Sequence, residues 1–139
     1  MSVEENKAIV RRFVEVIQCQ HHLDAVDELF GPDFVDHSGN SNPPNREGAR
    51  QLFAMMSAAF PDLDVKIQQQ IGEGDKVVTM KSFHGTHQGE FMGIPATGKK
   101  IAFNAIEILR LEDGKIVEHW AVGDNLGMMQ QLGVLPVMG

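Results

Sequence analysis

The chain has 139 residues, 42% of them apolar and 22% charged, which is the size and balance of one globular domain spanning 1–139. A net charge of −7 and a pI of about 5.2 argue against nucleic acid or an anionic membrane surface as partner. No apolar stretch approaches the roughly 20 residues of a membrane span. The first residues are acidic and polar where a signal peptide would be basic and then apolar, so a cytoplasmic location is expected. The single cysteine, Cys19, excludes an intrachain disulfide and a Cys-rich metal site.

Three helices are expected in the first 60 residues. Ser2 and Glu5 have the spacing of a capping box, which opens a helix with a broad apolar stripe. Asp24 can cap a short second helix that is stopped by Gly31-Pro32. A third helix is predicted over 46–60, where apolar side chains recur on one face.

The second half of the chain reads as strands. Apolar and polar residues alternate, and turn signals such as Asp113-Gly114 separate the runs. Asn125 can cap a last helix that Gly133 stops. Helices followed by an antiparallel meander predict an α+β fold in which a curved sheet folds over the helices and leaves a cavity between them. The four strands are expected over 64–71, 76–86, 101–112 and 115–123.

The hairpin at Asp113-Gly114 allows a prediction of which side chains share a face. With a two-residue turn, Glu107 opposes Trp120 and Phe103 opposes Asp124. One face then carries Phe103, Ala105, Glu107, Leu109, Trp120, Val122 and Asp124. The other carries Asn104, Ile106, Ile108, Arg110, Val117, His119 and Ala121, which places His119 at an interface. Both faces are largely apolar, so we expect one to be covered by helices and the other by a second copy in a homodimer. A bulge near Gly123 would shift this register.

Two interpretations of Asp124 remain open at this point. It directly precedes Asn125 and can cap the last helix. It also follows Trp120 at the strand end, where shielding by the ring would raise its pKa towards the range useful for proton transfer. Two interpretations also remain open for Glu107 and Glu118, which lie either at the solvated rim of the sheet or in a buried position.

The order of the motifs resembles the SnoaL-like polyketide cyclases, also called ester cyclases, of the nuclear-transport-factor-two-like superfamily. The resemblance covers nearly the whole chain. It is carried by six segments: Phe34-Val35-Asp36-His37, Arg46-Glu47-Gly48, Ala59-Phe60-Pro61-Asp62-Leu63, the glycine-rich loop 85–99, Asp113 to Trp120 with Asp124, and Leu132-Gly133.

The resemblance implies a cone-shaped α+β barrel with a deep apolar cavity, usually an oligomer, and no cofactor. Its characterised members close a ring by intramolecular aldol condensation, in which an aspartate removes and returns protons. By its position after the tryptophan, Asp124 matches that aspartate. The implied ligand is a hydrophobic, polyketide-like carbonyl compound.

Further site residues are expected around such a cavity. The enolate needs a hydrogen-bond donor, and His37, at a strand end before the long polar loop, is the catalytic candidate, with an ordinary surface role as the open alternative. His87 is expected either to contact the ligand or to brace the glycine-rich loop by a hydrogen bond. No metal site is expected, because the six histidines show no metal-ligand spacing with carboxylates. The expected substrate-binding residues are Trp120, Glu107, Phe103, His87, Phe91 and Met56.

Two other functions fit the same fold. Epoxide hydrolysis needs an Asp-Arg-Asp arrangement, and Arg110 falls on the face opposite Asp124 in the predicted register. A non-catalytic ligand-binding or dimerisation module is also open, because a fold does not fix a function. The chain has no tyrosine, which rules out an oxyanion hole built on a tyrosine hydroxyl.

Overall fold

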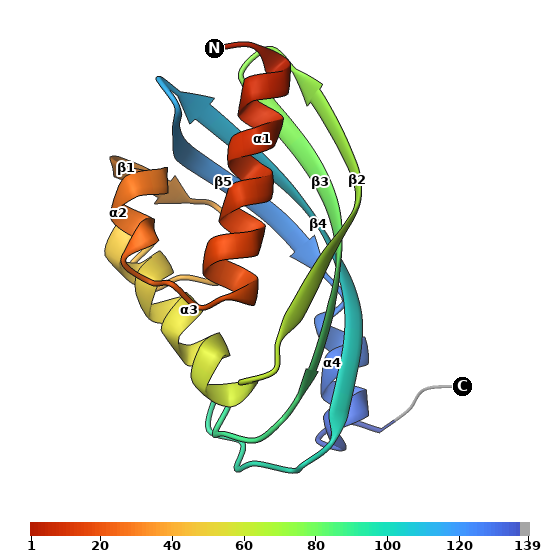
Figure 1. The fold of residues 1–139 in the computed structure, drawn as a ribbon. Helices are drawn as coiled ribbons and strands as arrows, with labels where there is room; N and C mark the ends of the chain where they lie inside the picture. Colours follow the sequence, from red (N-terminus) through yellow and green to blue (C-terminus); the bar gives the residue numbers. More distant parts are fainter. Residues whose placement is uncertain (137–139) are drawn as a thin grey trace.

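The computed structural model describes residues 1–136 as a curved five-stranded sheet with α1, α2 and α3 on one side and α4 packed at β4, away from them (Figure 1). This confirms the α+β class. Within these residues, no helix combines the length and hydropathy needed to cross a membrane. The elements are α1 (Val3–Phe13), the π-helical turn η1 (Val14–Cys19), α2 (Ala25–Leu29), β1 (Phe30–Asp36), α3 (Arg46–Ala59), β2 (Asp64–Glu73), β3 (Lys76–Thr86), β4 (Lys100–Glu112), β5 (Lys115–Gly123) and α4 (Asn125–Leu132).

The predicted capping signals of α1 and the Gly133 stop of α4 are confirmed, whereas Asp24 makes no side-chain cap hydrogen bond to α2 and Asn125 does not cap α4. The Ser2 hydroxyl accepts from the Glu5 amide at 3.0 Å, and the Glu5 carboxylate accepts from the Ser2 amide at 3.2 Å, so the capping box is confirmed. The predicted third helix is confirmed as α3, which Asn45 caps through the Gly48 amide. The short α2 ends one residue earlier than expected because Phe30 is already extended, with Gly31-Pro32 inside the edge strand β1.

The predicted antiparallel meander is confirmed for β2 to β5, and the sheet has one more strand. Its order is β1-β5-β4-β3-β2, with β1 parallel to β5. This pairing sets Asp36 beside His119, although 83 positions separate them in the sequence. A parallel neighbour joined by a long crossover leaves no local sequence signal, so only an extended segment was predictable here.

The predicted register of the β4–β5 hairpin is wrong beyond its first two pairs. Glu112 pairs with Lys115, but Val117 bulges out and the ladder resumes at Arg110 with Glu118. Glu107 therefore pairs with Ala121 rather than Trp120. A shift of one residue exchanges the two faces of a strand. The bulge turns His119 inward beside the helices and Trp120 outward, the reverse of the expectation for both.

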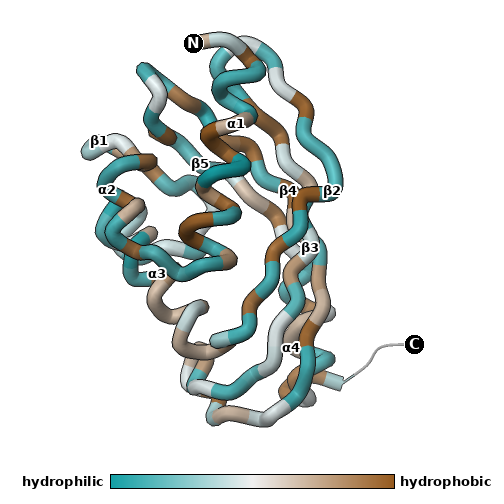
Figure 2. The backbone as a smooth tube through the Cα atoms, in the orientation of Figure 1, coloured by the Kyte–Doolittle hydropathy of each residue, from teal (hydrophilic) through white to brown (hydrophobic). Residues whose placement is uncertain are grey.

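The core lies between the helices and the concave face of the sheet. Figure 2 shows hydrophobic and hydrophilic residues alternating along α1 and the strands, as expected for elements that bury one face. The most buried large side chains include Val10, Ile17, Phe30, Phe60, Val77, Leu109 and Ile116. The convex face keeps apolar side chains in solvent, with Ile106 51% and Val122 80% exposed.

Candidate active site

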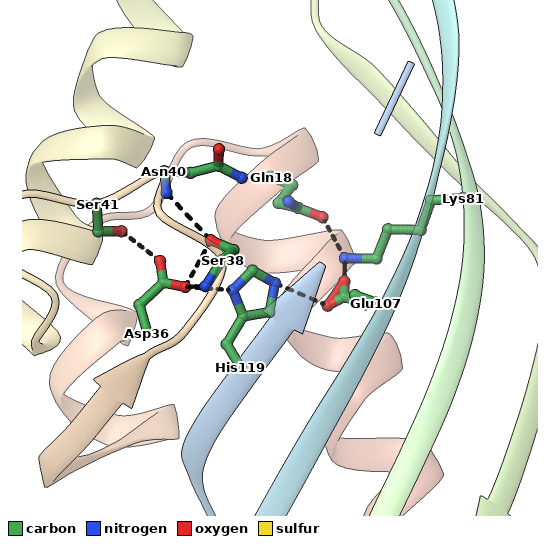
Figure 3. Close-up of polar contacts among 8 residues, drawn as sticks. All are labelled: Gln18, Asp36, Ser38, Asn40, Ser41, Lys81, Glu107 and His119. Atoms are coloured by element: carbon green, nitrogen blue, oxygen red, sulfur yellow. Dashed lines mark hydrogen bonds and ion pairs between the residues drawn. The ribbon is translucent and has the colours of Figure 1, made fainter. Parts of the chain in front are cut away.

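A buried carboxylate at the end of β1 is the first element of the site. Asp36 accepts hydrogen bonds from the Ser38 amide (2.8 Å) and hydroxyl (2.6 Å) and from the Ser41 hydroxyl (2.6 Å). His119 Nδ1 lies 3.1 Å from Asp36 Oδ1 (Figure 3). Burial acts to raise the pKa of Asp36, but the hydrogen bonds from His119, Ser38 and Ser41 outweigh it and hold this pKa well below its usual value. Asp36 is therefore an ionised acceptor, and His119 Nδ1 carries a proton towards it.

The other nitrogen of His119 faces a second carboxylate. His119 Nε2 lies 3.7 Å from Glu107 Oε2, which is buried and has no hydrogen-bond partner within residues 1–136. Since Asp36 accepts at the Nδ1 side, Nε2 is the ring nitrogen that faces Glu107. A proton taken up there lies beside the Glu107 carboxylate.

Glu107 is paired in turn with a buried lysine. Lys81 Nζ forms an ion pair with Glu107 Oε1, donates to Gln18 Oε1 at 3.0 Å and lies 4.6 Å from the centre of the Phe13 ring. The two charged side chains are 2% and 5% exposed. Burial lowers the pKa of the Lys81 ammonium to about 7. A carboxylate in contact with an amine, as Glu107 is here, favours the charged form of that amine. Removing either partner would leave the other as an unpaired buried charge.

These contacts join five side chains into one line, which we call the interior polar chain: Gln18, Lys81, Glu107, His119 and Asp36 (Figure 3). They come from η1, β3, β4, β5 and β1. His119 is its most exposed ionisable member, with 20% of its side chain accessible. An imidazole between two carboxylates can accept and return one proton, which is the requirement for general acid–base catalysis.

An apolar region adjoins the interior polar chain. Phe83 lies two residues beyond Lys81 on the same face of β3, and its ring stacks on Phe103 with centres 4.8 Å apart. The adjoining pocket has a volume of about 30 Å³, close to the space of one water molecule and far below that of a typical ligand cavity. Its lining residues are Ile17, Gln18, His21, Phe53, Met56, Leu63 and Phe83. Of the expected substrate-binding residues, Met56 lines this pocket and Phe103 contacts its wall.

Asp124 and His37 lie apart from the interior polar chain. Asp124 is exposed and caps α4, accepting from the Gly127 amide at 2.9 Å. The capping interpretation is thus confirmed, and the acid–base role of Asp124 stays a prediction. His37 stacks on Trp120 with ring centres 4.9 Å apart and lies 3.9 Å from Glu118. The bulge in β5 turns Trp120 to the convex side of the sheet, where His37 stacks on it.

His87 and Phe91 hold the glycine-rich loop. His87 is fully buried and its Nδ1 bonds the Thr97 hydroxyl (2.9 Å) and amide (3.2 Å). The loop-bracing interpretation of His87 is confirmed. Phe91 packs on Phe60 with ring centres 5.3 Å apart. Substrate contact by either side chain stays a prediction.

Sequence reasoning missed four members of the interior polar chain and found only Glu107. The burial of Lys81 was predictable from the sequence, because Lys81 lies on the same face of β3 as Val77 and Phe83. A lysine on such an apolar face is buried only when it is paired with an opposite charge. His119 was assigned to the wrong face by the unrecognised bulge. Asp36 needed the parallel pairing of β1, and Gln18 needed the π-helical turn.

Comparison with known proteins identifies relatives of the same fold. The chain is 28% identical over 130 residues to aklanonic acid methyl ester cyclase DnrD from Streptomyces peucetius, covering 90% of this chain and 88% of that one. Its structure superposes on TsrD from Streptomyces laurentii with a TM-score of 0.88 at 26% identity, covering 97% and 99% of the two chains. IdmH from Streptomyces antibioticus gives a TM-score of 0.79 at 35% identity, covering 93% and 99%. The model of the SnoaL-like polyketide cyclases matches residues 7–132, and the chain belongs to this family.

Proposed function

We propose that this protein is a cofactor-independent cyclase that closes a ring in a polyketide-like carbonyl compound by intramolecular aldol chemistry, with His119 as the acid–base group. The observation that carries the proposal is the position of His119 between the Asp36 and Glu107 carboxylates. The relationship to an ester cyclase supports the reaction class.

The proposed reaction moves one proton out and back. His119 Nε2 removes a proton from the carbon next to a substrate carbonyl, and the electron pair of that bond forms an enolate. The enolate carbon attacks a second carbonyl of the same molecule, which forms the new carbon–carbon bond and an alkoxide. The alkoxide takes the proton back from His119, so the protein returns to its starting state.

Asp124 is the competing acid–base group, and two substitutions separate the candidates. His119→Gln removes the titrating nitrogen, and its kcat on a panel of polyketide-like β-keto methyl esters should fall by about 100-fold or more, as loss of a general base does. Asp124→Asn keeps a good helix cap and should retain kcat within about threefold. Loss of turnover in Asp124→Asn, with turnover retained in His119→Gln, would move the assignment to Asp124.

A ligand-binding module without catalysis is the second candidate. It is favoured by the small size of the pocket, which Phe53, Met56 and Phe83 fill with side chains. Ligand entry then requires these flexible side chains to move apart. Saturable binding of a polyketide-like ketone, with no product in the wild-type protein for any ester of the panel, would support this candidate over the cyclase.

The epoxide hydrolase alternative is not supported by the surroundings of Arg110. Its guanidinium lies 3.1 Å from Glu118, 3.6 Å from Asp75 and 3.5 Å from Glu112. Since Arg110 pairs with Glu118, it points to the convex side, away from the interior polar chain.

We also propose that the convex face of the sheet is the contact surface of a homodimer. Ile106 and Val122 are exposed there on neighbouring strands, and they are paired directly in the β4–β5 ladder. An apolar patch at the centre of a sheet face is typical of a protein–protein contact. A second copy of the chain would cover it.

A further inference from the structure

Gln18 lies where the interior polar chain meets the pocket. Its Oε1 accepts from Lys81 Nζ at 3.0 Å, and the same residue lines the 30 Å³ pocket. Its side chain is partly exposed, whereas Lys81 and Glu107 behind it are buried. Gln18 is therefore the member of the interior polar chain that a ligand in the pocket meets first.

The chemistry of Lys81 fixes the orientation of the Gln18 amide. An ammonium group has three donors and no acceptor, so the amide oxygen turns towards it. The amide nitrogen then points the other way, and within residues 1–136 it has no hydrogen-bond partner. Two N–H donors are left for an acceptor on a ligand.

The π-helical turn brings Gln18 to this position. The Gln20 amide donates to the Glu15 carbonyl at 3.1 Å, five residues back, in place of the four-residue spacing of an α-helix. Phe13 and Gln18 are also five residues apart, and both contact Lys81. Such wide turns are rare and frequently occur at functional sites.

From this geometry we propose that the Gln18 amide nitrogen binds a carbonyl oxygen of the ligand in the pocket, and that Lys81 is the positioning residue that orients the amide. The inference rests on the proposed function in taking the ligand to be the cyclase substrate. A donor aimed at this oxygen stabilises the negative charge that develops on it when the enolate forms. Gln18 itself forms and breaks no covalent bond.

The first test is Gln18→Glu, which keeps the shape and the contact with Lys81 but removes both N–H donors. We expect kcat on the ester panel to fall by about 100-fold, the size of effect found when one oxyanion donor is lost. The matched control is Gln20→Glu, which makes the same charge change at an exposed position two residues along and should leave kcat within twofold. Equal kcat values for the two variants would overturn the proposal.

A second measurement does not depend on turnover. The infrared carbonyl stretch of a bound polyketide-like ketone should lie at lower frequency in the wild-type protein than in Gln18→Glu, and His119→Gln should keep the wild-type band. This result would support the Gln18 contact even if no variant turned over an ester. An unchanged band in Gln18→Glu, or no ketone binding by the wild-type protein, would overturn it.

The role of Lys81 needs a variant that leaves no unpaired buried charge. In the double variant Lys81→Met, Glu107→Gln both charges are removed together, and the Gln18 amide is free to present either end to the ligand. The carbonyl band should then split or broaden relative to the wild-type band. A single band at the wild-type frequency would show that Lys81 does not orient the amide.

Discussion

At the scale of single residues, the interior polar chain is stabilised by charge pairs and hydrogen bonds that its members make only in the folded state. Asp36 shows this most clearly, because four hydrogen bonds from three residues end on its two oxygens. The same bonds that fix its ionised form also fix the proton of His119 on Nδ1, which leaves Nε2 free for chemistry. In the proposed mechanism, stability and function therefore depend on one carboxylate.

The first residue-scale prediction concerns the pH dependence of stability. The folded-state pKa of Asp36 lies below the unfolded value of about 3.9, so its contribution is fully present above pH 4 to 5 and is lost as the pH falls through the folded pKa. Asp36→Asn should lower the free energy of unfolding at pH 7 by about 2 kcal/mol, because buried donors lose their charged acceptor. Urea denaturation from pH 7 down to pH 3 should show this gap narrowing below about pH 4.

The control for this prediction is Asp33→Asn on the same strand. Asp33 is exposed, so its replacement should change the free energy of unfolding by no more than about 0.5 kcal/mol at either end of the pH range. A gap for Asp36→Asn that stays constant down to pH 3 would contradict the assigned role of the carboxylate.

At the scale of the elements, features that depend on neighbouring residues were predicted correctly, and features that depend on distant parts of the chain were not. Alternation and the Asp113-Gly114 turn located β3 and β5 at both ends, because these depend on neighbouring residues alone. The bulge at Val117 depends on which face of β5 meets the helices, and that is decided by the whole fold. Because of this one extra residue in β5, His119 points into the candidate site and Trp120 points to the convex face.

The element-scale prediction concerns the cap of α4. Asp124→Ala removes the acceptor of the Gly127 amide and should lower the free energy of unfolding by about 1 kcal/mol, whereas Asp124→Asn should change it by a few tenths at most. Chemical denaturation of both variants checks this. If Asp124 served catalysis instead, both variants would lose turnover equally whatever their stability, so the two measurements separate the roles.

At the scale of the whole molecule, the site is assembled from parts that are far apart in sequence. Asp36 and His119 meet only because β1 joins the sheet beside β5, and Lys81 meets Gln18 only because the helices lie on the concave face. The family resemblance correctly indicated an α+β fold from motif order, but not the place of β1 beside β5. It could not indicate the interior polar chain, because the motifs contain Asp36 and His119 but not the β1–β5 pairing and the β5 bulge that bring them together.

The prediction at the scale of the whole molecule concerns a homodimer that forms through the convex face of the sheet. If two copies pack through it, Val122→Glu places a charge in the middle of the contact, and each copy would bury one unpaired carboxylate. Size-exclusion chromatography with light scattering should show a dimer for the wild-type chain and a monomer for Val122→Glu. Leu126→Glu, at a similarly exposed apolar position on α4, should remain dimeric. A monomeric wild-type chain would refute the homodimer outright, while a dimeric Val122→Glu would place the contact on another surface. Since the interior polar chain opens on the opposite side of the sheet, dissociation should leave the kcat of Val122→Glu near the wild-type value.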